Sequence, residues 1–376
     1  MTEPAAKTLL IAPDRLFGWC RQLLMAAGVP TGDAEEIARH LLFADLRGVS
    51  THGTSRLKIY LTRMAAGLVD PNPQIRVLRE TPVSAWLDGG NGFGQVVARR
   101  ATDLAIEKAR AAGVAVVGVK NSTHCGCMAY YTMRMAEAGL IGMAATNAPA
   151  VMPPYGGKEA FFGTNPFSVA APAGDGQIFV FDMATSQVSR GKIIEAAREG
   201  RPIPEGWATD KDGHPTTDAK AALEGFLLPL GGPKGYLLAF MVELFSGILT
   251  GARIGPDLPR MYESMGEPQQ VGHFFWAFRP DLFLPMEEFT QRMAQTMERV
   301  RNVAPAPGFE RVLAPGDLEL AKEAKNRSQG IPIPPGMYRE FCELASRYGV
   351  PFPVAPTTPE VIAHADQQGE TGSQER

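Results

Sequence analysis

The chain contains 376 residues, of which 45% are hydrophobic and 20% are charged, a balance typical of a globular protein of up to three domains with a sizeable core. Its formal net charge is −3 and no stretch carries five like charges in a row, which argues against a nucleic-acid partner. The 4 cysteines are too few for a disulfide framework and residues 1–10 lack the apolar core of a signal peptide, so we expect a cytoplasmic protein.

Two helices are predicted first, over residues 33–48 and 57–67. Apolar residues recur there at helical spacing, and each stretch ends in glycine. Pro71 and Pro73 then break the chain. These prolines predict a boundary between an N-terminal helical part, residues 1–75, and the segment that follows.

The middle of the chain has the pattern of an α/β fold. Alternation over 83–87 predicts a strand, and a glycine turn then leads into a long helix over 95–112. The continuous apolar run 114–119 predicts a strand buried on both faces. Further strands are expected at 140–146, 167–171, 178–182 and 274–278, and further helices at 130–138, 192–198 and 287–301.

The most apolar stretch covers residues 236–249. It is shorter than the ~20 residues that a membrane span needs, and it contains Glu243 and Ser246. We therefore expect a buried helix there and no membrane partner.

The C-terminal part begins after Pro305 and Pro307, which mark a second boundary. The segments 302–353 are expected to join the helical part at the N-terminus, so that helices flank the α/β middle. Beyond residue 353 the composition turns to Pro, Thr, Gln, Gly and Ser, which predicts a mobile tail over 354–376.

Residues 90–95, Gly-Asn-Gly-Phe-Gly-Gln, have the appearance of a dinucleotide-binding loop between a strand and a helix. The Rossmann fingerprint requires a glycine three residues after its second glycine, and Gln95 stands at that position. A glycine turn between a strand and a helix is therefore the favoured interpretation.

The polar loop 50–56 is the first candidate site. If the second helix starts near Thr51, then His52 and Arg56 lie four residues apart on one face. Reduction of a 2-oxo acid requires such a pair, because the alkoxide must be protonated and the carboxylate held. The alternatives are a solvated helix start and a hydrolase in which Ser50 or Thr51 acts with His52, for which no orienting carboxylate is apparent.

Residues 121–127 end a predicted central strand, where ligands of α/β sheets gather. His124 is therefore a second candidate acid or base, and the alternative is a histidine satisfied at a strand end. A metal site of His124, Cys125 and Cys127 is disfavoured, because ligands this close together cannot wrap a tetrahedral ion. We expect no metal.

Two further turns are candidates for phosphate binding. Residues 163–166 precede a strand, residues 182–186 end the next strand, and residues 190–192 (Arg-Gly-Lys) start a helix. Free N–H groups at a helix start, with positive side chains beside them, suit a phosphate. The alternative is an ordinary strand-to-helix turn capped by hydroxyls.

Taken together, these segments resemble the type-2 malate/L-lactate dehydrogenase family, which includes sulfolactate and ureidoglycolate dehydrogenases, diketogulonate reductase and piperideine-2-carboxylate reductase. The resemblance spans roughly residues 44–330. The matching segments are 44–48 with His52, Gly53 and Arg56, then 121–126, 154–157, 163–166, 182–186, 206–208, 215–218, 233–236 and 315–316.

The resemblance implies a non-Rossmann cofactor domain, residues 76–301, in which helices wrap a mixed, largely antiparallel sheet. It also implies a homodimer with active sites near the subunit interface. The implied activity is hydride transfer between NAD or NADP and a small 2-hydroxy or 2-oxo acid.

The resemblance also implies roles for single residues. The catalytic residues it implies are His52, His124, Thr51 and Arg56. The substrate contacts it implies are Arg56, Thr164 and Lys192. The cofactor contacts it implies are Cys125, Gly126, Thr164, Asn165, Asp182, Met183, Ala184, Arg190, Gly191, Lys234, Pro315, Gly316 and Asp317. Of the two histidines, His52 is slightly favoured as the acid/base, because Arg56 would hold the substrate beside it.

Some positions depart from the family pattern. Thr51 stands where serine is usual, and the hydroxyl survives. Cys125 and Met128 replace an aromatic residue and a glycine. Imine-reducing members tend to carry Asp at the position of Lys192, which favours ketone chemistry over cyclic-imine reduction. Oxidation of ureidoglycolate and a non-catalytic nucleotide-binding role are the remaining alternatives.

Overall fold

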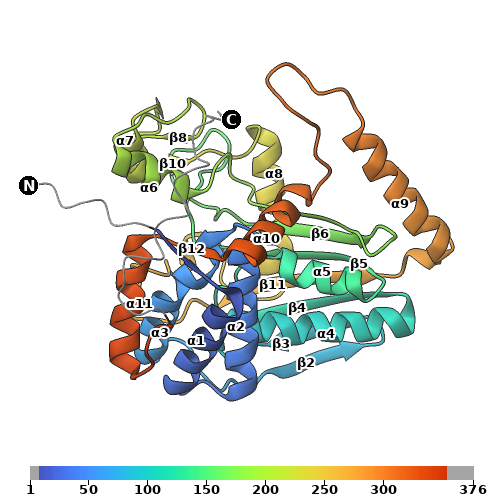
Figure 1. Ribbon diagram of the computed structural model, residues 1–376, viewed down its shortest axis with the longest axis horizontal. Helices are drawn as coiled ribbons and strands as arrows, with labels where there is room; N and C mark the ends of the chain where they lie inside the picture. Colours follow the sequence, from blue (N-terminus) through green and yellow to red (C-terminus); the bar gives the residue numbers. More distant parts are fainter. Residues whose placement is uncertain (1–7, 354–376) are drawn as a thin grey trace, which may run out of the picture.

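The computed structural model describes residues 8–353 and is organised around one seven-stranded sheet (Figure 1). In spatial order the strands are β2 (Arg76–Thr81), β3 (Ser84–Asp88), β4 (Val114–Ser122), β11 (Val271–Phe278), β5 (Ile141–Thr146), β6 (Phe167–Pro172) and β7 (Ile178–Met183). Only β3 and β4 run parallel, and all other neighbours in this sheet are antiparallel. This confirms the predicted mixed, largely antiparallel sheet.

The strand directions place the polar motifs at one edge of this sheet. Because β4 and β5 are both antiparallel to β11, they run in the same direction on either side of it. The carboxyl ends of β3, β4, β5 and β7 therefore meet at the edge where β6 and β11 begin. The segments that leave this edge are 89–93, 123–128, 147–166 and 184–189.

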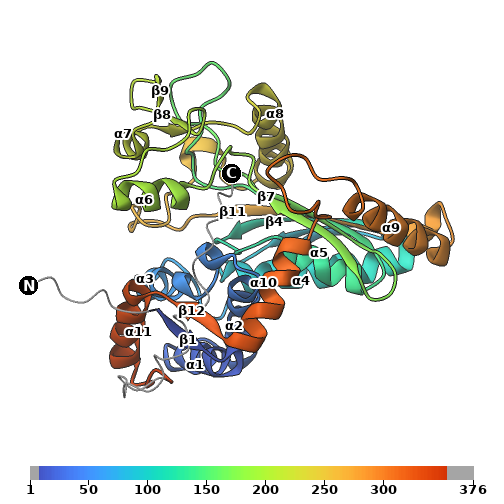
Figure 2. The same cartoon turned by 45° about the horizontal axis from the view of Figure 1, so that its top comes forward.

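Helices cover both faces of the sheet (Figure 2). They are α4 (Gly94–Ala112) and α5 (Ala129–Glu137) on one face, and on the other α8 (Pro233–Val242) with the π-helix Glu243–Ile248 that continues it. Tyr131 of α5 packs on Phe275, whereas Phe245 of the π-helix packs on Phe274 and Trp276. Because successive strand residues point to opposite faces, these contacts place the two groups on opposite sides.

The two ends of the described chain fold together. Strand β1 (Leu9–Ile11) pairs antiparallel with β12 (Ile331–Ile333). The helices of this part are α1 (Pro13–Ala26), α2 (Thr31–Leu46), α3 (Leu57–Ala65), α10 (Asp317–Gln329) and α11 (Pro335–Tyr348). Trp19, Leu41 and Phe341 belong to their common core. The division into domains at residues 75 and 302 stays a prediction, and the predicted tail, residues 354–376, lies outside the described residues.

A smaller lobe with its own core lies beside the sheet (Figures 1 and 2). Its elements are α6 (Arg190–Glu199), β8 (Ala208–Thr209), β9 (Pro215–Thr216), α7 (Ala219–Glu224) and β10 (Phe226–Leu227). Met152, Phe162 and Ile193 are buried in its core. The remaining helix, α9 (Met286–Arg301), extends along the outside of the molecule (Figure 1).

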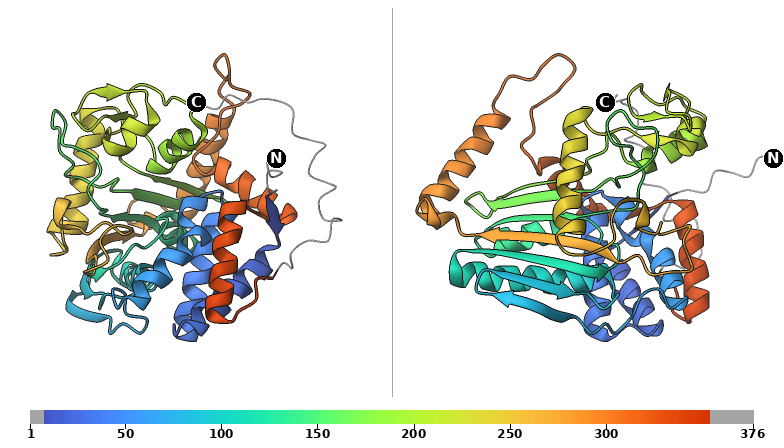
Figure 3. Two further views of the ribbon diagram at one scale, coloured as in Figure 1. Left: turned by 90° about the vertical axis from the view of Figure 1, so that its left-hand side faces the viewer. Right: turned by 180° about the vertical axis from the view of Figure 1, so that it is seen from behind.

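The helix predicted at 236–249 exists, but the expectation that it is buried is wrong. Its inner face carries small residues, among them Gly235, Ala239 and Gly247, which let it pack closely. Several of its large residues point outward, and four of them form what we call the apolar stripe: Leu237, Phe240, Leu244 and Ile248, each 43–63% exposed. Figure 3 shows α8 at the surface in the view from behind. Within residues 8–353, no helix is both long and apolar enough to cross a bilayer.

His273 lies at the centre of the sheet and has no exposed surface. Its Nδ1 is 2.8 Å from the hydroxyl of Thr146 on β5, and its Nε2 is 2.8 Å from the hydroxyl of Ser122 on β4. The side chain therefore links β11 to both of its neighbours. Burial lowers the pKa of His273 to about 3, so the ring is neutral over most of the pH range in which the protein is folded.

We expect His273 to make the protein sensitive to acid. Below pH 6.5 the unfolded chain binds a proton at this residue that the folded chain does not, so the free energy of unfolding falls as the pH falls toward 3. At pH 5 the loss from this one group is about 2 kcal/mol. Urea unfolding of wild type and His273→Gln between pH 5 and 7.5 measures it, and the variant should show the shallower pH slope.

The control for this experiment is His214→Gln, which changes a histidine whose side chain is 77% exposed. Its slope should match that of the wild type. Equal slopes for wild type and His273→Gln would mean that the buried ring takes up a proton as readily as the unfolded chain does.

Candidate active site

The loop between α2 and α3 forms two separate 3₁₀ turns, Ser50–His52 and Thr54–Arg56. The second helix therefore does not start near Thr51, which was the condition for His52 and Arg56 to share a helical face; α3 begins at Leu57, as the predicted helix 57–67 does. The break is at Gly53, whose backbone is extended because the Asp45 carboxylate lies against it and leaves no room for a side chain. That carboxylate accepts hydrogen bonds from the backbone N–H of Thr54 (2.9 Å) and its hydroxyl (2.6 Å).

His52 and His124, the two candidate acid/base residues, meet in the structure. Their rings stack with centroids 5.4 Å apart and an interplanar angle of 24°. His124 follows β4 at the carboxyl edge of the sheet, and His52 reaches it from the loop before α3. The hydroxyl of Thr51 lies 3.0 Å from His52 Nδ1. The two sequence motifs therefore form one site.

Both imidazoles are neutral near pH 7. Each ring keeps some contact with solvent, but burial among the surrounding atoms lowers the pKa of His52 to about 3 and the pKa of His124 well below its usual value. The positive charge of Arg56 acts in the same direction on both rings. Arg56 therefore supplies the positive charge beside two uncharged rings.

Arg56 is held from two sides. Its Nε donates to the carbonyl of Thr51 (2.5 Å), and its Nη1 donates to the hydroxyl of Tyr262. The guanidinium carbon also lies 5.6 Å from the centroid of the Tyr262 ring, within range of a cation–π contact. Its Nη2 has no hydrogen-bond partner among residues 8–353, so this end of the fork can bind a carboxylate.

The segment that carries Tyr262 is anchored to α3 by Arg63. This side chain is 1% exposed, and it donates to the carbonyl oxygens of Met261 (3.0 Å), Ser264 (2.8 Å) and Glu267 (3.1 Å). A buried guanidinium is costly unless it is hydrogen-bonded. Arg63 therefore holds the backbone of this segment firmly, which keeps Tyr262 beside Arg56.

The start of α6 lies next to the histidine-bearing loop. A Cβ added at Gly191 would be 3.4 Å from the methyl group of Thr51, so the two segments are in contact distance. Arg190 donates to the carbonyl of Leu223 (3.1 Å). Lys192 is exposed and forms no ion pair with another residue in the range 8–353. The start of α6 therefore lies beside the loop that carries His52.

Several segments predicted to bind cofactor converge around the end of β7. The carboxylate of Asp182 accepts a hydrogen bond from the N–H of Ala129 at the start of α5 (2.8 Å). Thr185 donates from both its N–H and its hydroxyl to the carbonyl of Thr164 (2.8 and 2.9 Å) and accepts from the N–H of Leu230 (2.9 Å). That last contact brings the start of α8 and Lys234 close to the strand end.

The start of α10 also reaches this strand. Gly316 has a left-handed backbone (φ 95°) and packs so closely on Val180 of β7 that a Cβ there would crowd it at 2.9 Å. Met183, Ala184 and Pro315 lie in the same stretches of backbone. The positions named for the cofactor therefore gather around one strand end, although their contacts to a cofactor stay a prediction.

Three of these positions use their side chains within the protein. Asn165 is fully buried, and its amide accepts from Ala148 and donates to the carbonyl of Ala239 and to Glu243. Asp317 forms a two-pronged ion pair with Arg301 (2.8 and 3.0 Å). Cys125 is 1% exposed. At these positions only the backbone remains for a ligand, as it does at Gly126, which packs against the ring of His40.

Sequence reasoning missed three residues of the site: Tyr60, Gln95 and Tyr262. The Tyr60 hydroxyl lies 2.7 Å from His124 Nδ1, and Gln95 Nε2 donates to that hydroxyl (2.9 Å). In the sequence, Tyr60 is one apolar position of a helix and Gln95 is the residue that breaks the fingerprint. The one available signal was that Tyr60 follows Arg56 by four residues, which places both on one side of a helical path.

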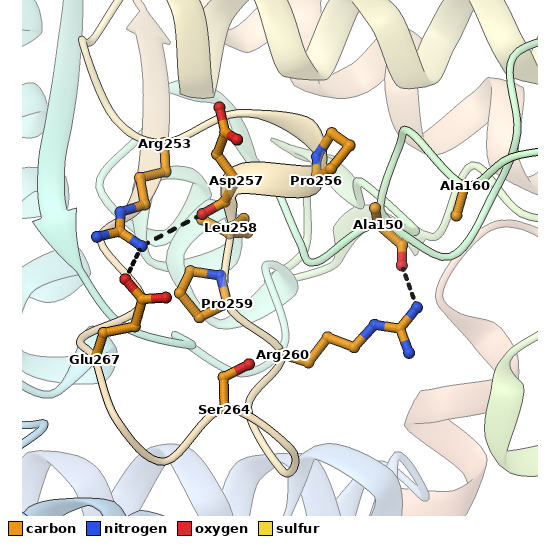
Figure 4. Close-up of a pocket in the computed structure, with 10 residues that line it drawn as sticks. All are labelled: Ala150, Ala160, Arg253, Pro256, Asp257, Leu258, Pro259, Arg260, Ser264 and Glu267. Atoms are coloured by element: carbon orange, nitrogen blue, oxygen red, sulfur yellow. Dashed lines mark hydrogen bonds and ion pairs between the residues drawn. The ribbon is translucent and has the colours of Figure 1, made fainter.

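One cavity, of about 730 Å³, does not contain the histidines (Figure 4). Its lining residues are Ala150, Ala160, Arg253, Pro256, Asp257, Leu258, Pro259, Arg260, Ser264 and Glu267. Arg253 donates to the carboxylate of Glu267 (2.6 Å), and Arg260 donates to the carbonyl of Ala150 (3.4 Å). Because this cavity contains neither the two histidines nor Arg56, we place the active site at the histidines. Within residues 8–353, no group of three potential metal ligands occurs.

Comparison with known proteins identifies relatives over nearly the full length. The sequence pattern of the malate/L-lactate dehydrogenase family matches residues 11–342. The L-sulfolactate dehydrogenase of Methanocaldococcus jannaschii is 40% identical over 345 residues, which cover 91% of this chain and 98% of the relative. The ureidoglycolate dehydrogenase (NAD(+)) of Escherichia coli is 37% identical over 329 residues, which cover 88% and 94%.

Solved structures agree with these matches. The sulfolactate dehydrogenase from M. jannaschii superimposes with a TM-score of 0.87 at 38% identity, over 92% of this chain and 98% of that one. The Δ1-piperideine-2-carboxylate reductase from Pseudomonas syringae superimposes with a TM-score of 0.81 at 32% identity, over 90% and 100%. The superimposed regions of the two structures include nine-tenths or more of this chain, so they cover the fold as well as most of the segments that form the site.

Proposed function

The chain belongs to the malate/L-lactate dehydrogenase family, and on this basis we propose that its site moves a hydride between NAD or NADP and a small 2-hydroxy or 2-oxo acid of the malate, lactate or sulfolactate type. The observation that carries the proposal is the pair of neutral, stacked histidines beside Arg56. A negatively charged substrate, a proton-transfer group and a hydride partner are what this reaction requires.

The nicotinamide cofactor supplies or accepts the hydride. The groups that follow the end of β7 suit the phosphates of this cofactor, because the start of α6 offers backbone N–H groups next to the side chains of Arg190 and Lys192. Lys234 adds an exposed positive charge at the start of α8. We assign the binding of the cofactor phosphates to these residues, together with the backbone at Gly316.

Arg56 binds and orients the substrate carboxylate. Its Nε and Nη1 are held by Thr51 and Tyr262, so the fork cannot swing away when the substrate leaves. Its Nη2 is left for the substrate, and a guanidinium binds a carboxylate with a defined plane. The carbon that gains or loses hydride is thereby fixed next to the carboxylate-holding group.

His124 moves the proton. As hydride leaves C2 of a 2-hydroxy acid, the hydroxyl proton passes to His124 Nε2, and in reduction the same nitrogen returns it to the oxygen. The sequence pattern slightly favoured His52 for this role. We favour His124 because buried groups hold its Nδ1 (2.7 and 3.3 Å), whereas the corresponding atom of His52 meets the exposed hydroxyl of Thr51. His52 packs against the reacting ring and excludes water from one side of it.

The hydrolase alternative lacks support. Thr51 and His52 do lie within hydrogen-bond distance (3.0 Å), but no carboxylate among residues 8–353 bonds to either active-site histidine. A nucleophile–histidine pair needs such an orienting group. The relatives are dehydrogenases and a reductase. Ureidoglycolate oxidation and cyclic-imine reduction, the reactions in two relatives' names, remain second candidates for the same site.

We also propose a homodimer in the cytoplasm. The apolar stripe on α8 and the π-helix exposes four large side chains side by side, and a patch of this kind on a globular protein marks a contact surface. A two-fold axis would bring the stripe against its own copy, since a symmetric dimer uses the same patch on both subunits.

The reaction itself is tested by the absorbance of reduced nicotinamide with a panel of 2-oxo acids, ureidoglycolate and a cyclic imino acid. We expect turnover of a 2-oxo acid. Arg56→Lys should raise its KM about 10- to 100-fold, because lysine cannot replace a guanidinium fork, while the KM of the cofactor stays the same. A variant that loses cofactor affinity and keeps its substrate KM would assign Arg56 to the cofactor instead.

The histidine roles are separated by His52→Ala and His124→Ala. We expect kcat to fall about 10²- to 10⁴-fold in His124→Ala and far less in His52→Ala. A base works when it is unprotonated, and a lowered pKa keeps it so in acid. The acid limb of kcat/KM for oxidation should therefore lie well below pH 6.5. Should both variants keep most of their rate, Lys192 becomes the next candidate.

The dimer is tested by the double variant Leu237→Glu, Leu244→Glu. Two carboxylates in the apolar stripe cannot be buried without partners, so the variant should sediment as a monomer while the wild type sediments as a dimer. Leu10→Glu, at an apolar residue that is 52% exposed on β1, is the control and should remain dimeric. A double variant that stays dimeric would place the interface elsewhere.

A further inference from the structure

Behind His124 lies a short chain of buried polar groups that comes from three separate elements. Tyr60 belongs to α3, Gln95 to the first turn of α4, and His124 to the loop after β4. The Tyr60 hydroxyl is 2.7 Å from His124 Nδ1, and Gln95 Nε2 is 2.9 Å from the hydroxyl oxygen. Tyr60 is 5% exposed and Gln95 is fully buried. Water therefore cannot substitute for these partners.

One atom in this chain is unsatisfied. The amide oxygen of Gln95 is buried and has no hydrogen-bond partner among the described residues. Buried polar atoms are rarely left unpaired, and those that are call for an explanation. Turning the amide by 180° would place this oxygen where the nitrogen now meets Tyr60, and a hydroxyl can serve as donor or acceptor. The chain can therefore run in either of two directions.

In the first direction Gln95 donates to Tyr60, and the Tyr60 hydroxyl donates to His124 Nδ1. The backbone N–H of Gly126 also points at this nitrogen, at 3.3 Å. Nδ1 is then an acceptor, so a neutral His124 carries its hydrogen on Nε2. A nitrogen that already bears a hydrogen cannot take the proton of a substrate hydroxyl.

In the second direction His124 Nδ1–H donates to Tyr60, Tyr60 donates to the turned Gln95 amide, and the bond from the Gly126 N–H (3.3 Å) is given up. Nε2 then has a free lone pair and accepts the hydroxyl proton. The resulting imidazolium keeps its Nδ1–H bonded to Tyr60, and it gives the Nε2 proton back when the reaction runs as a reduction. The proton that leaves the substrate is the one that His124 then holds, and the hydride goes to the cofactor, so both hydrogens removed from the hydroxy acid are accounted for.

We propose that Tyr60 and Gln95 are positioning residues that form a reversible hydrogen-bond relay, which decides which nitrogen of His124 carries hydrogen and so makes it competent as acid and base. The proposal rests on the proposed role of His124 in hydride-transfer chemistry. Neither Tyr60 nor Gln95 needs to touch the substrate for it. The relay acts on the ring from the side opposite to the reacting nitrogen.

Tyr60→Phe removes only the hydroxyl and keeps the ring that packs on Phe93. We expect its kcat to fall about 10- to 100-fold, the loss typical of a hydrogen bond to a charged group, while the KM values of acid and cofactor stay within about threefold. Gln95→Leu should show the same fall in kcat with nearly unchanged KM values, because leucine has no oxygen to accept the hydrogen of Tyr60 in the second hydrogen-bond direction. Tyr130→Phe, at a half-buried tyrosine of α5 that packs on His40 and Phe43, is the matched control and should keep the kcat of the wild type.

A second readout does not depend on activity. The chain has 6 histidines, so ¹⁵N-labelling of histidine gives few ring signals, and those of His124 are identified by their absence in His124→Asn. In the free protein we expect Nδ1 of His124 to give the signal of an unprotonated, hydrogen-bonded nitrogen. Tyr60→Phe should shift that signal and Tyr130→Phe should not.

The outcomes separate the relay from the reaction. A fall in kcat with unchanged His124 signals would mean that Tyr60 acts by another route, and an unchanged kcat would mean that the relay is not needed; either result overturns the proposal. If His124→Ala keeps its activity, the proposed acid/base is wrong, and the nitrogen signals alone then decide whether Tyr60 and Gln95 set the tautomer.

Discussion

The insertion of β11 between β4 and β5 is the constraint on which the rest of the structure depends. These two strands are close in the sequence, yet a strand formed by residues 271–278 separates them and pairs with both. It forces β4 and β5 to run in the same direction, so the loops after them open at one edge. His273 reinforces the arrangement with a hydrogen bond to each side. Without this strand, the loop after β4 that carries His124 and the segment near Thr164 after β5 would not lie at the same edge of the sheet.

The electrostatic character of the site follows from this packing. Burial among several elements lowers the pKa values of the two histidines and leaves the rings uncharged, and the positive charge of Arg56 adds to this effect. Among these three residues, Arg56 therefore supplies the positive charge that attracts an anionic substrate, and the two rings stay uncharged. The uncharged state also leaves the imidazoles free to accept a proton, which charged rings could not do.

Local patterns predicted most elements of the fold. The helix at 94–112, the strands around residue 116 and residue 144, and both candidate histidines follow from periodicity and from polar residues at strand ends. Strand β2 was missed because all six of its residues are exposed and show no alternation. The stripe on α8 was misjudged because a sequence does not reveal whether a neighbouring surface is present to cover an apolar face.

The candidate site was predicted only where the chemistry lies in short motifs. Tyr60 and Gln95 come from helices that are separate in the sequence, and only tertiary packing brings them to His124. Gln95 is instructive, because the residue that made a nucleotide fingerprint fail turned out to be a buried polar partner. The conditional placement of His52 and Arg56 on one helical face failed for a similar reason, since Asp45, from another helix, lies against Gly53 where the loop breaks into two turns.

Helix α3, together with Arg56 at its N-cap, has a further consequence for protein engineering. Arg56, Tyr60 and Arg63 follow one another at helical spacing, and they contact in turn the carboxylate-binding end of the site, the proton-transfer ring and the segment 261–267. A single rigid helix thus serves as the common reference for binding and for chemistry. Residues of the segment 261–267 that Arg63 holds through backbone oxygens can be exchanged without altering those bonds. Substitutions confined to these side chains therefore leave in place the bonds that keep Tyr262 beside Arg56.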